Sequence, residues 1–423
     1  MKNKRVWLLL LIFGGGLIAV FSQCFSPDDK PDVRGEAYAG SKKCMKCHED
    51  IYRSYLLTAH YHSSQRATDS TVHGSFEHGH NSVAFNNGDA VLVMNKRAGG
   101  MYQTASKNAK EYRSERFDIV FGGNKAESYV YWKGAKPYEL PASYYRSLHG
   151  WANSPGYDTR LPYFEREVTQ RCFECHASYV TQPPVTNTMQ NRYAGFDTTT
   201  MIYGIDCERC HGPAANHVNF HIANPGEKVA RYITTYRSLS RKQRLDDCAV
   251  CHGGNKDELQ TSAFNFKPGD NLASFKLPHF FPKQLSTTDI DVHGDQNGLL
   301  AASKCFIMSN MDCGTCHNMH RNEAANLTVY SQKCISCHNN ANHNFCTNKM
   351  APEALIKANC IDCHMPLTPS KIIYVVANGR RLSPYSVRTH HITIYPEESK
   401  KQLIALISKI KTAAAPARQK NED

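Results

Sequence analysis

The chain has 423 residues, of which 41% are hydrophobic, so it can form two or three domains with buried cores and is not disordered as a whole. It carries 50 Lys and Arg against 38 Asp and Glu, a formal net charge of +12 that, taken alone, indicates an anionic partner. Its 17 cysteines are too few for a disulfide miniprotein and too many for ordinary usage, so their spacing decides the class of protein.

The N-terminus predicts export. A basic lead at 2–5 precedes an apolar run at 6–21, shorter than the roughly 20 residues that cross a bilayer, which indicates a secretory signal at 1–23. Cys24 stands where lipoprotein signals carry their acylated cysteine, although Gln23 replaces the usual Gly or Ala. An uncleaved anchor, or a plain signal with an incidental cysteine, stays open. The folded part is expected outside the cytoplasm, periplasmic or at the cell surface, tethered to a membrane by a linker at 24–40.

One motif, Cys-x-x-Cys-His, accounts for 14 of the 17 cysteines. It occurs seven times, and we number the copies one to seven in chain order: Cys44/Cys47/His48, Cys172/Cys175/His176, Cys207/Cys210/His211, Cys248/Cys251/His252, Cys313/Cys316/His317, Cys334/Cys337/His338 and Cys360/Cys363/His364.

The motif has the chemistry of c-type haem attachment. Two thiols one helical turn apart can each form a thioether with a haem vinyl group, and the following histidine can bind the iron as its proximal ligand. A zinc ribbon needs no histidine after the second cysteine, and a thioredoxin-like pair occurs once per domain. Seven covalently bound haem c groups are therefore predicted.

Between the motifs, the pattern predicts the following elements. A first haem segment at 41–64 is followed by a haem-free, β-rich insertion at 65–170, with strands at 83–85, 91–93 and 117–121 and a hairpin at 128–140 that turns near Gly134. Residues 171–395 carry six motifs and should hold little regular secondary structure, because haems would supply the apolar core. Residues 396–423 form an amphipathic helix to Lys411 and a polar tail from Thr412.

Several segments resemble the cytochrome c-552/4 domain family of multihaem cytochromes. The matching segments are 40–60, 204–217, 303–320, 360–366 and 389–391, with Tyr55 where relatives more often have Trp. The resemblance implies a fold class of mostly short helices and irregular loops wrapped around haems, here with a β-rich insertion after the first haem and a C-terminal helix. It also implies a periplasmic-type electron carrier or electron-input subunit.

Fourteen of the 21 histidines lie outside the motifs and are the candidates for distal iron ligands. The expected ligands are His60, His217, His293, His320, which should cap a neighbouring haem, His343, and one of His390 and His391 at the last site. The seventh position is open, with His149, His221 and His279 in reserve. His62, His73, His78 and His80 lie in a loop expected to be solvated, and Met365 is expected to pack.

The remaining features concern charge and the leftover cysteines. Seven haems would add about 14 propionate charges, which offset the basic excess, so no nucleic-acid partner is predicted. Cys305 and Cys346 either form a disulfide or are buried apolar residues.

Two imidazoles on each iron leave no position for substrate, which predicts a membrane-anchored electron-transfer protein of a respiratory chain. Its partners would be a quinol-linked or soluble donor and a terminal reductase or surface acceptor, and its oligomeric state is open. The alternative is a reductase of nitrite, hydroxylamine or a sulfur oxyanion at one open haem, although the chain lacks the Cys-x-x-Cys-Lys motif of pentahaem nitrite reductases. A polymerising structural wire is a third possibility. We therefore expect an electron carrier more than an enzyme, with no catalytic residue.

Overall fold

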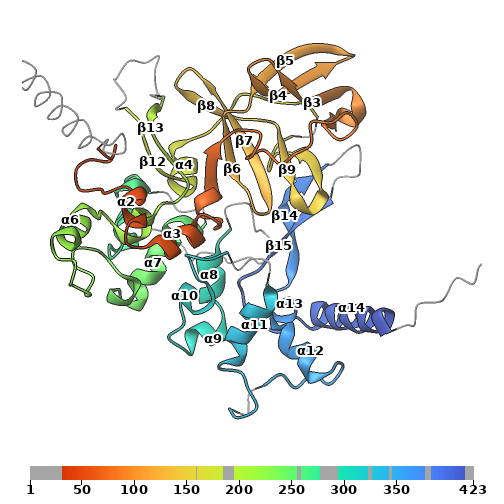
Figure 1. Ribbon diagram of the computed structural model, residues 1–423. Helices are drawn as coiled ribbons and strands as arrows, with labels where there is room; N and C mark the ends of the chain where they lie inside the picture. Colours follow the sequence, from red (N-terminus) through yellow and green to blue (C-terminus); the bar gives the residue numbers. More distant parts are fainter. Residues whose placement is uncertain are drawn as a thin grey trace, which may run out of the picture.

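The computed structural model describes residues 31–158, 160–183, 195–254, 259–276, 294–322, 326–342, 345–376 and 383–414. Short helices of the N-terminal and middle segments lie on one side, β-sheets lie beside them, and the helices of the C-terminal third lie below (Figure 1). The expected signal peptide, Cys24, His279, His293 and His343 lie outside the described residues.

Two antiparallel sheets dominate the region between the first two motifs. The larger sheet has seven strands: β1 (Ser64–Arg66), β6 (Ile119–Gly122), β7 (Ala126–Lys133), β8 (Lys136–Glu139), β9 (Ala142–Tyr145), β10 (Gly150–Asn153) and β11 (Arg166–Glu167). The smaller has four: β2 (Ser82–Phe85), β3 (Ala90–Arg97), β4 (Gly100–Lys107) and β5 (Lys110–Arg116). The expected β-rich insertion is thus confirmed, while the domain boundaries stay predictions.

The structure bears out the three expected strands of this region. Strands β2, β3 and β6 cover most of the three expected segments, although β6 begins at Ile119, two residues late. The expected hairpin is formed by β7 and β8, whose register pairs Lys133 with Lys136 around Gly134 at φ +62°. Gly tolerates this left-handed conformation without a Cβ clash.

The β-region has its own aromatic core, centred on Trp151. Its indole is fully buried against Phe117 and Tyr129, and the indole N–H donates to the Ser75 carbonyl at 2.7 Å. This core needs no prosthetic group, because its apolar surface is supplied by side chains alone.

Replacing Trp151 is expected to destabilise the β-region in two distinguishable steps. Trp151→Ala should cost about 3–5 kcal/mol through a cavity, and Trp151→Phe, which loses mainly the hydrogen bond, about 1 kcal/mol. Denaturant unfolding followed by far-ultraviolet circular dichroism would measure both. Equal losses for the two variants would contradict the packing role of the indole.

Outside the β-region, the helices are short, as expected, except for the 19-residue helix near the C-terminus. They are α2 (Ser41–Met45), α3 (Glu49–Tyr55), α4 (Gln170–His176), α5 (Cys207–His211), α6 (Ala215–Ala223), α7 (Arg241–His252), α8 (Gln296–Ala301), α9 (Lys304–Ile307), α10 (Cys313–Cys316), α11 (Leu327–Ile335), α12 (Glu353–Ala358), α13 (Cys360–His364) and α14 (Pro396–Ala414). Single 3₁₀ turns are η1 (Tyr61–Ser63), η2 (Asn86–Gly88), η3 (Arg146–Leu148), η4 (Tyr236–Ser238), η5 (Ala263–Asn265) and η6 (Leu272–Phe275). No helix in the described part of the chain is long and apolar enough to cross a membrane.

Two details of the chain beyond motif two differ from the sequence prediction. Two hairpins occur where little regular structure was expected, β12 (Ala177–Thr181) with β13 (Asp197–Tyr203), and β14 (Leu367–Val375) with β15 (Ser383–Arg388). The second is held by Asn153 of the β-region, which donates to the Tyr374 carbonyl at 3.0 Å and accepts from the Val376 amide at 2.7 Å. The C-terminal helix continues to Ala414, so the first residues of the expected polar tail are helical.

Candidate haem sites

Each motif lies on or beside a short helical turn, which puts its two thiols three residues apart on one side. The turn is closed by the motif histidine itself in several copies, since the His48 amide donates to the Cys44 carbonyl at 2.9 Å and the His338 amide to Cys334 at 2.8 Å. Caps fix where the turns begin. Asp206 accepts from the Arg209 amide at 3.0 Å before motif three, and Asp312 forms a capping box before motif five.

In the described part of the chain, four motif histidines face a second imidazole. The pairs and their ring-centroid distances are His48 and His217 at 6.4 Å, His211 and His320 at 6.0 Å, His252 and His60 at 6.1 Å, and His317 and His390 at 6.3 Å. Two imidazoles that bind one metal atom from opposite sides, each nitrogen about 2 Å away, would have centroids roughly 6 Å apart. The observed spacing therefore fits an iron atom between each pair.

The other ring nitrogen of several histidines is anchored to the backbone. Nδ1 lies 2.8 Å from the Thr234 carbonyl in His211, 2.7 Å from Arg231 in His217, and 2.9 Å from Thr393 in His364. Because a carbonyl can only accept, Nδ1 carries the proton and Nε2 keeps a lone pair. This tautomer and ring orientation are those of a metal-binding imidazole.

Burial keeps two of the facing imidazoles neutral. Burial, with a smaller contribution from His252, lowers the pKa of His60 to about 4. Burial and the neighbouring His317 lower the pKa of His390 to about 4 as well. A neutral ring retains the lone pair that a metal needs.

Thiols of different motifs lie close together, and this orders the motifs in space. Hydrogen bonding between thiols joins motifs one and three through Cys44 and Cys207, two and four through Cys175 and Cys251, four and five through Cys248 and Cys313, and six and seven through Cys334 and Cys360.

Weaker electrostatic contacts complete this order. Desolvation raises the pKa of Cys210, and Asp247 and Cys251 add to the rise, which places motif three beside motif four. The pKa of Cys334 is raised first by the hydrogen bond of this thiol with Cys360, and Cys316 adds to the rise. This contribution places motif five beside motif six. The resulting spatial order is one, three, four, five, six, seven, with motif two beside motif four.

Some motif cysteines are exposed in the described chain, namely Cys47 of motif one and Cys337 of motif six. That haems supply the apolar core of this region stays a prediction. The first cysteines of motifs one and six, Cys44 and Cys334, are half-buried because each contacts the thiol of a neighbouring motif. The thiols of Cys47 and Cys337 are accessible for covalent attachment, and that role stays a prediction.

The structure places the distal candidates as follows. His60, His217, His320 and His390 each lie opposite a motif histidine, and His320 faces a motif other than the one it follows, as the sequence analysis expects. His390 faces motif five and not the last motif, because the chain folds back from β15 toward α10. His391 instead lies near the hydroxyl of Tyr395, at 3.4 Å.

Other expectations need correction. His73 is exposed, as expected for a solvated loop, but its Nδ1 also lies 2.5 Å from the fully buried Glu127 carboxylate. Cys305 and Cys346 are unpaired, and Cys346 is exposed, so neither expected role fits Cys346. Of the reserve histidines, His149 ends a 3₁₀ turn at φ +46°, and His221 lies beside His217 with ring centroids 4.6 Å apart.

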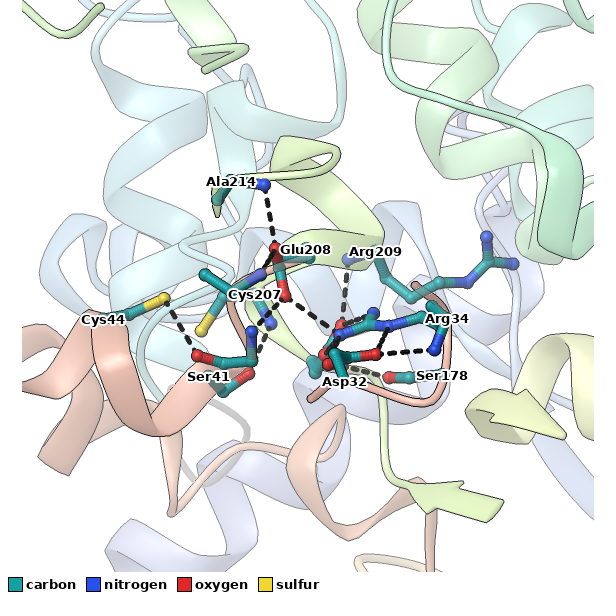
Figure 2. Close-up of polar contacts among 12 residues, drawn as sticks. Asp32, Arg34, Ser41, Cys44, Ser178, Cys207, Glu208, Arg209 and Ala214 are labelled. Atoms are coloured by element: carbon teal, nitrogen blue, oxygen red, sulfur yellow. Dashed lines mark hydrogen bonds and ion pairs between the residues drawn. The ribbon is translucent and has the colours of Figure 1, made fainter. Parts of the chain in front are cut away.

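A buried ion cluster was not foreseen from the sequence. Arg34 lies 2.9 Å from Asp32, Asp206 and Glu208, and the four side chains are almost fully buried beside Cys44 and Cys207 (Figure 2). Counted from Arg34, Asp206 and Glu208 lie 172 and 174 positions away along the chain, so no local sequence pattern indicates the cluster.

Comparison with known proteins gives two similarities. The family model described as cytochrome c554 and c-prime matches residues 146–212, which include motifs two and three. Among solved structures, the chain is similar to the crystal structure of the outer cell wall cytochrome OcwA, with a TM-score of 0.51 and 16% identity over 86% of this chain and 81% of that chain. The chain shares the fold of that cytochrome. No curated protein matches the sequence.

These similarities confirm the expected fold class in its coarse form, a cytochrome fold of short helices with several β-sheets. The matching family model is not that of the cytochrome c-552/4 domain, so the narrower family assignment stays a prediction. The seven haems, their ligands, the lipid anchor and the redox partners also stay predictions.

Proposed function

We propose that this protein is a seven-haem c-type cytochrome that carries electrons outside the cytoplasm. The observation that carries the proposal is the set of four facing imidazole pairs, each formed by a motif histidine and a histidine from a distant segment. A pair would fill both ligand positions of an iron, so these four haems would carry electrons and leave no position for substrate, which supports a carrier. The reductase alternative would need an open position at one of the other three motifs.

Haem c, when bound, supplies a one-electron couple between ferric and ferrous iron. The chain supplies the rest. Motif cysteines hold the group covalently, motif histidines and their facing imidazoles bind the iron, and backbone carbonyls keep the imidazole tautomer fixed. Contacts between neighbouring motifs would set the spatial order of the haems.

The proposal includes a place for the protein in the cell. The basic lead, the apolar run and Cys24 support a lipoprotein held to a membrane, and the OcwA structure is that of an outer cell wall cytochrome. A respiratory role with a quinol-linked donor and a terminal reductase follows from such a location. The propionate charges of seven haems would offset the basic excess of the chain, so this excess no longer indicates a nucleic-acid partner.

Haem content tests the proposal. Protein made in a host with working cytochrome maturation should be red, give seven haems per chain in the pyridine haemochrome assay, and gain about seven times 616 Da in intact mass. Cysteine-to-alanine replacement in one motif should remove one haem and leave six. Colourless mature protein, or zinc in place of the added mass, would overturn the proposal.

A further inference from the structure

The buried cluster of Asp32, Arg34, Asp206 and Glu208 carries an excess of negative charge. Glu208 accepts from the amides of Ala39, Gly40 and Ala214, each at 2.8 Å, and from the Arg34 guanidinium at 2.9 Å. All four neighbours are donors, so a proton on this carboxyl group would have no acceptor. The geometry therefore assigns Glu208 the ionised form, although burial raises the pKa of this carboxyl group.

Asp32 and Asp206 are surrounded by donors in the same way. Asp32 accepts from the backbone amide and the side chain of Arg34, each at 2.9 Å. Asp206 accepts from the Arg34 side chain and from the amide of Arg209 at 3.0 Å. Three carboxylates thus face a single guanidinium, which leaves a formal charge of −2 in a buried place.

The nearby Arg209 does not neutralise this charge. Its guanidinium points away from the cluster (Figure 2) and donates to the carbonyls of Ala263 at 3.0 Å and Glu174 at 3.1 Å. A buried charge acts over longer distances than an exposed one, because it is less screened by water and salt.

The cluster is adjacent to two haem-attachment positions. Glu208 directly follows Cys207 of motif three, and the amide of Gly40, which it binds, precedes the helix that carries Cys44 of motif one. The negative field reaches the Cys44 thiol, whose pKa is raised by its hydrogen bond to Cys207 and by burial, with Glu208 and Asp206 adding to the effect.

We propose that this cluster sets the reduction potential at motifs one and three, and holds it below the value that the same ligands would give without the cluster. The inference rests on the proposed function. Negative charge favours ferric over ferrous iron because the ferric site is one unit more positive, so nearby carboxylates lower the potential and a nearby cation raises it. The four residues are positioning residues in this role, since they act on the iron through space.

The test uses variants that change charge in opposite directions. Glu208→Gln and the milder Asp32→Asn each remove a negative charge, Arg34→Met removes the positive charge at similar length, and Arg34→Lys keeps the charge. Arg53→Met is the matched control, because Arg53 lies on the neighbouring helix α3 in an exposed pair with Glu49. Each full-length, haem-loaded variant is titrated spectroelectrochemically, with the ferric signals followed by electron paramagnetic resonance.

At the applied potential where the affected wild-type haems are half reduced, Glu208→Gln should raise their ratio of reduced to oxidised iron roughly tenfold, and Asp32→Asn should raise it less. Arg34→Met should lower the ratio, while Arg34→Lys and Arg53→Met should leave it near the wild-type value. A merely structural role would not move Glu208→Gln and Arg34→Met in opposite directions.

Shifts of the same sign in these two variants, or unchanged potentials in both, would overturn the inference. If Glu208→Gln does not fold, the signs for Asp32→Asn and Arg34→Met decide. Failure of the proposed function looks different, because a chain without seven haems would fail the haemochrome assay before any titration.

Discussion

Replacing His390 with alanine is expected to convert one haem in seven from low-spin to high-spin. The ring of His390 lies opposite that of His317 in motif five, so its loss opens one axial position on that iron. The low-spin ferric intensity in the electron paramagnetic resonance spectrum should fall by the share of one haem, and a high-spin signal of that size should appear. Added imidazole should restore the low-spin signal by filling the vacated position.

The adjacent histidine provides the control. His391 lies near Tyr395 and not opposite a motif histidine in the described part of the chain, so His391→Ala should leave the spectrum unchanged. Both variants should keep seven haems, because neither changes a cysteine. An all-low-spin spectrum for His390→Ala, or a high-spin signal for His391→Ala, would show that the ligand assignment at motif five is incorrect.

The contrast between these neighbouring histidines shows what the sequence can and cannot provide. The motif fixes its own chemistry because its parts are local: two cysteines and a histidine within one helical turn. The facing imidazole comes from elsewhere, as with His60, which follows motif one but faces His252 of motif four. Proximity in sequence therefore identifies good candidates, but folding of the whole chain decides which iron each would bind.

The β-region shows a similar division. Strands β2 and β3 alternate buried and exposed side chains and could be predicted, whereas β5 has no buried side chain and gives no period-two signal. Strand β5 forms because Asn108 and Ala109 turn the chain at φ 49° and 60°, which matches the twist of a tight hairpin. Ala is uncommon at a position with positive φ, so the sequence gives no clear signal for this turn.

The buried cluster around Arg34 marks the limit of sequence reasoning. Asp32 and Arg34 lie in a segment interpreted as a polar linker, and nothing local indicates that Asp206 and Glu208 will meet them. The cluster holds the start of helix α2 against motif three, so a segment with linker composition becomes a fixed part of the haem region. Composition describes what a segment could do alone and leaves out its tertiary partners.

Removing motif four is expected to interrupt electron flow, whereas removing motif two is not. In the spatial order of thiol contacts, motif four stands between three and five, and motif two lies to its side. Burial raises the pKa of Cys363 in motif seven, and the neighbouring Cys346 adds to the rise, so the exposed Cys346 offers a place for a photoreductant at the far end of this order. A Cys305→Ser background leaves Cys346 as the reactive thiol once Cys24 is acylated and the motif cysteines, the exposed Cys47 and Cys337 included, are thioethers.

Under steady illumination, the rapidly reduced fraction should reveal the order of the motifs. Without motif four (Cys248→Ala with Cys251→Ala), only motifs five to seven remain connected to the label, so about half of the six remaining haems should be reduced rapidly. Without motif three (Cys207→Ala with Cys210→Ala), motif one alone is cut off and about five of six should respond. Without motif two (Cys172→Ala with Cys175→Ala), all six should respond.

Intact mass should confirm that every double replacement removes one haem and no more. Each rapidly reduced fraction can then be assigned to a known set of six haems. The series distinguishes the branched order from a simple sequence order, in which loss of motif two would disconnect motif one and loss of motif four would disconnect three haems. Because the two orders differ in the motif-two variant, rapid reduction of all six of its haems supports the branch. Five of six would instead place motif two within the line, and the thiol contact between Cys44 and Cys207 would then not mark a route for electrons.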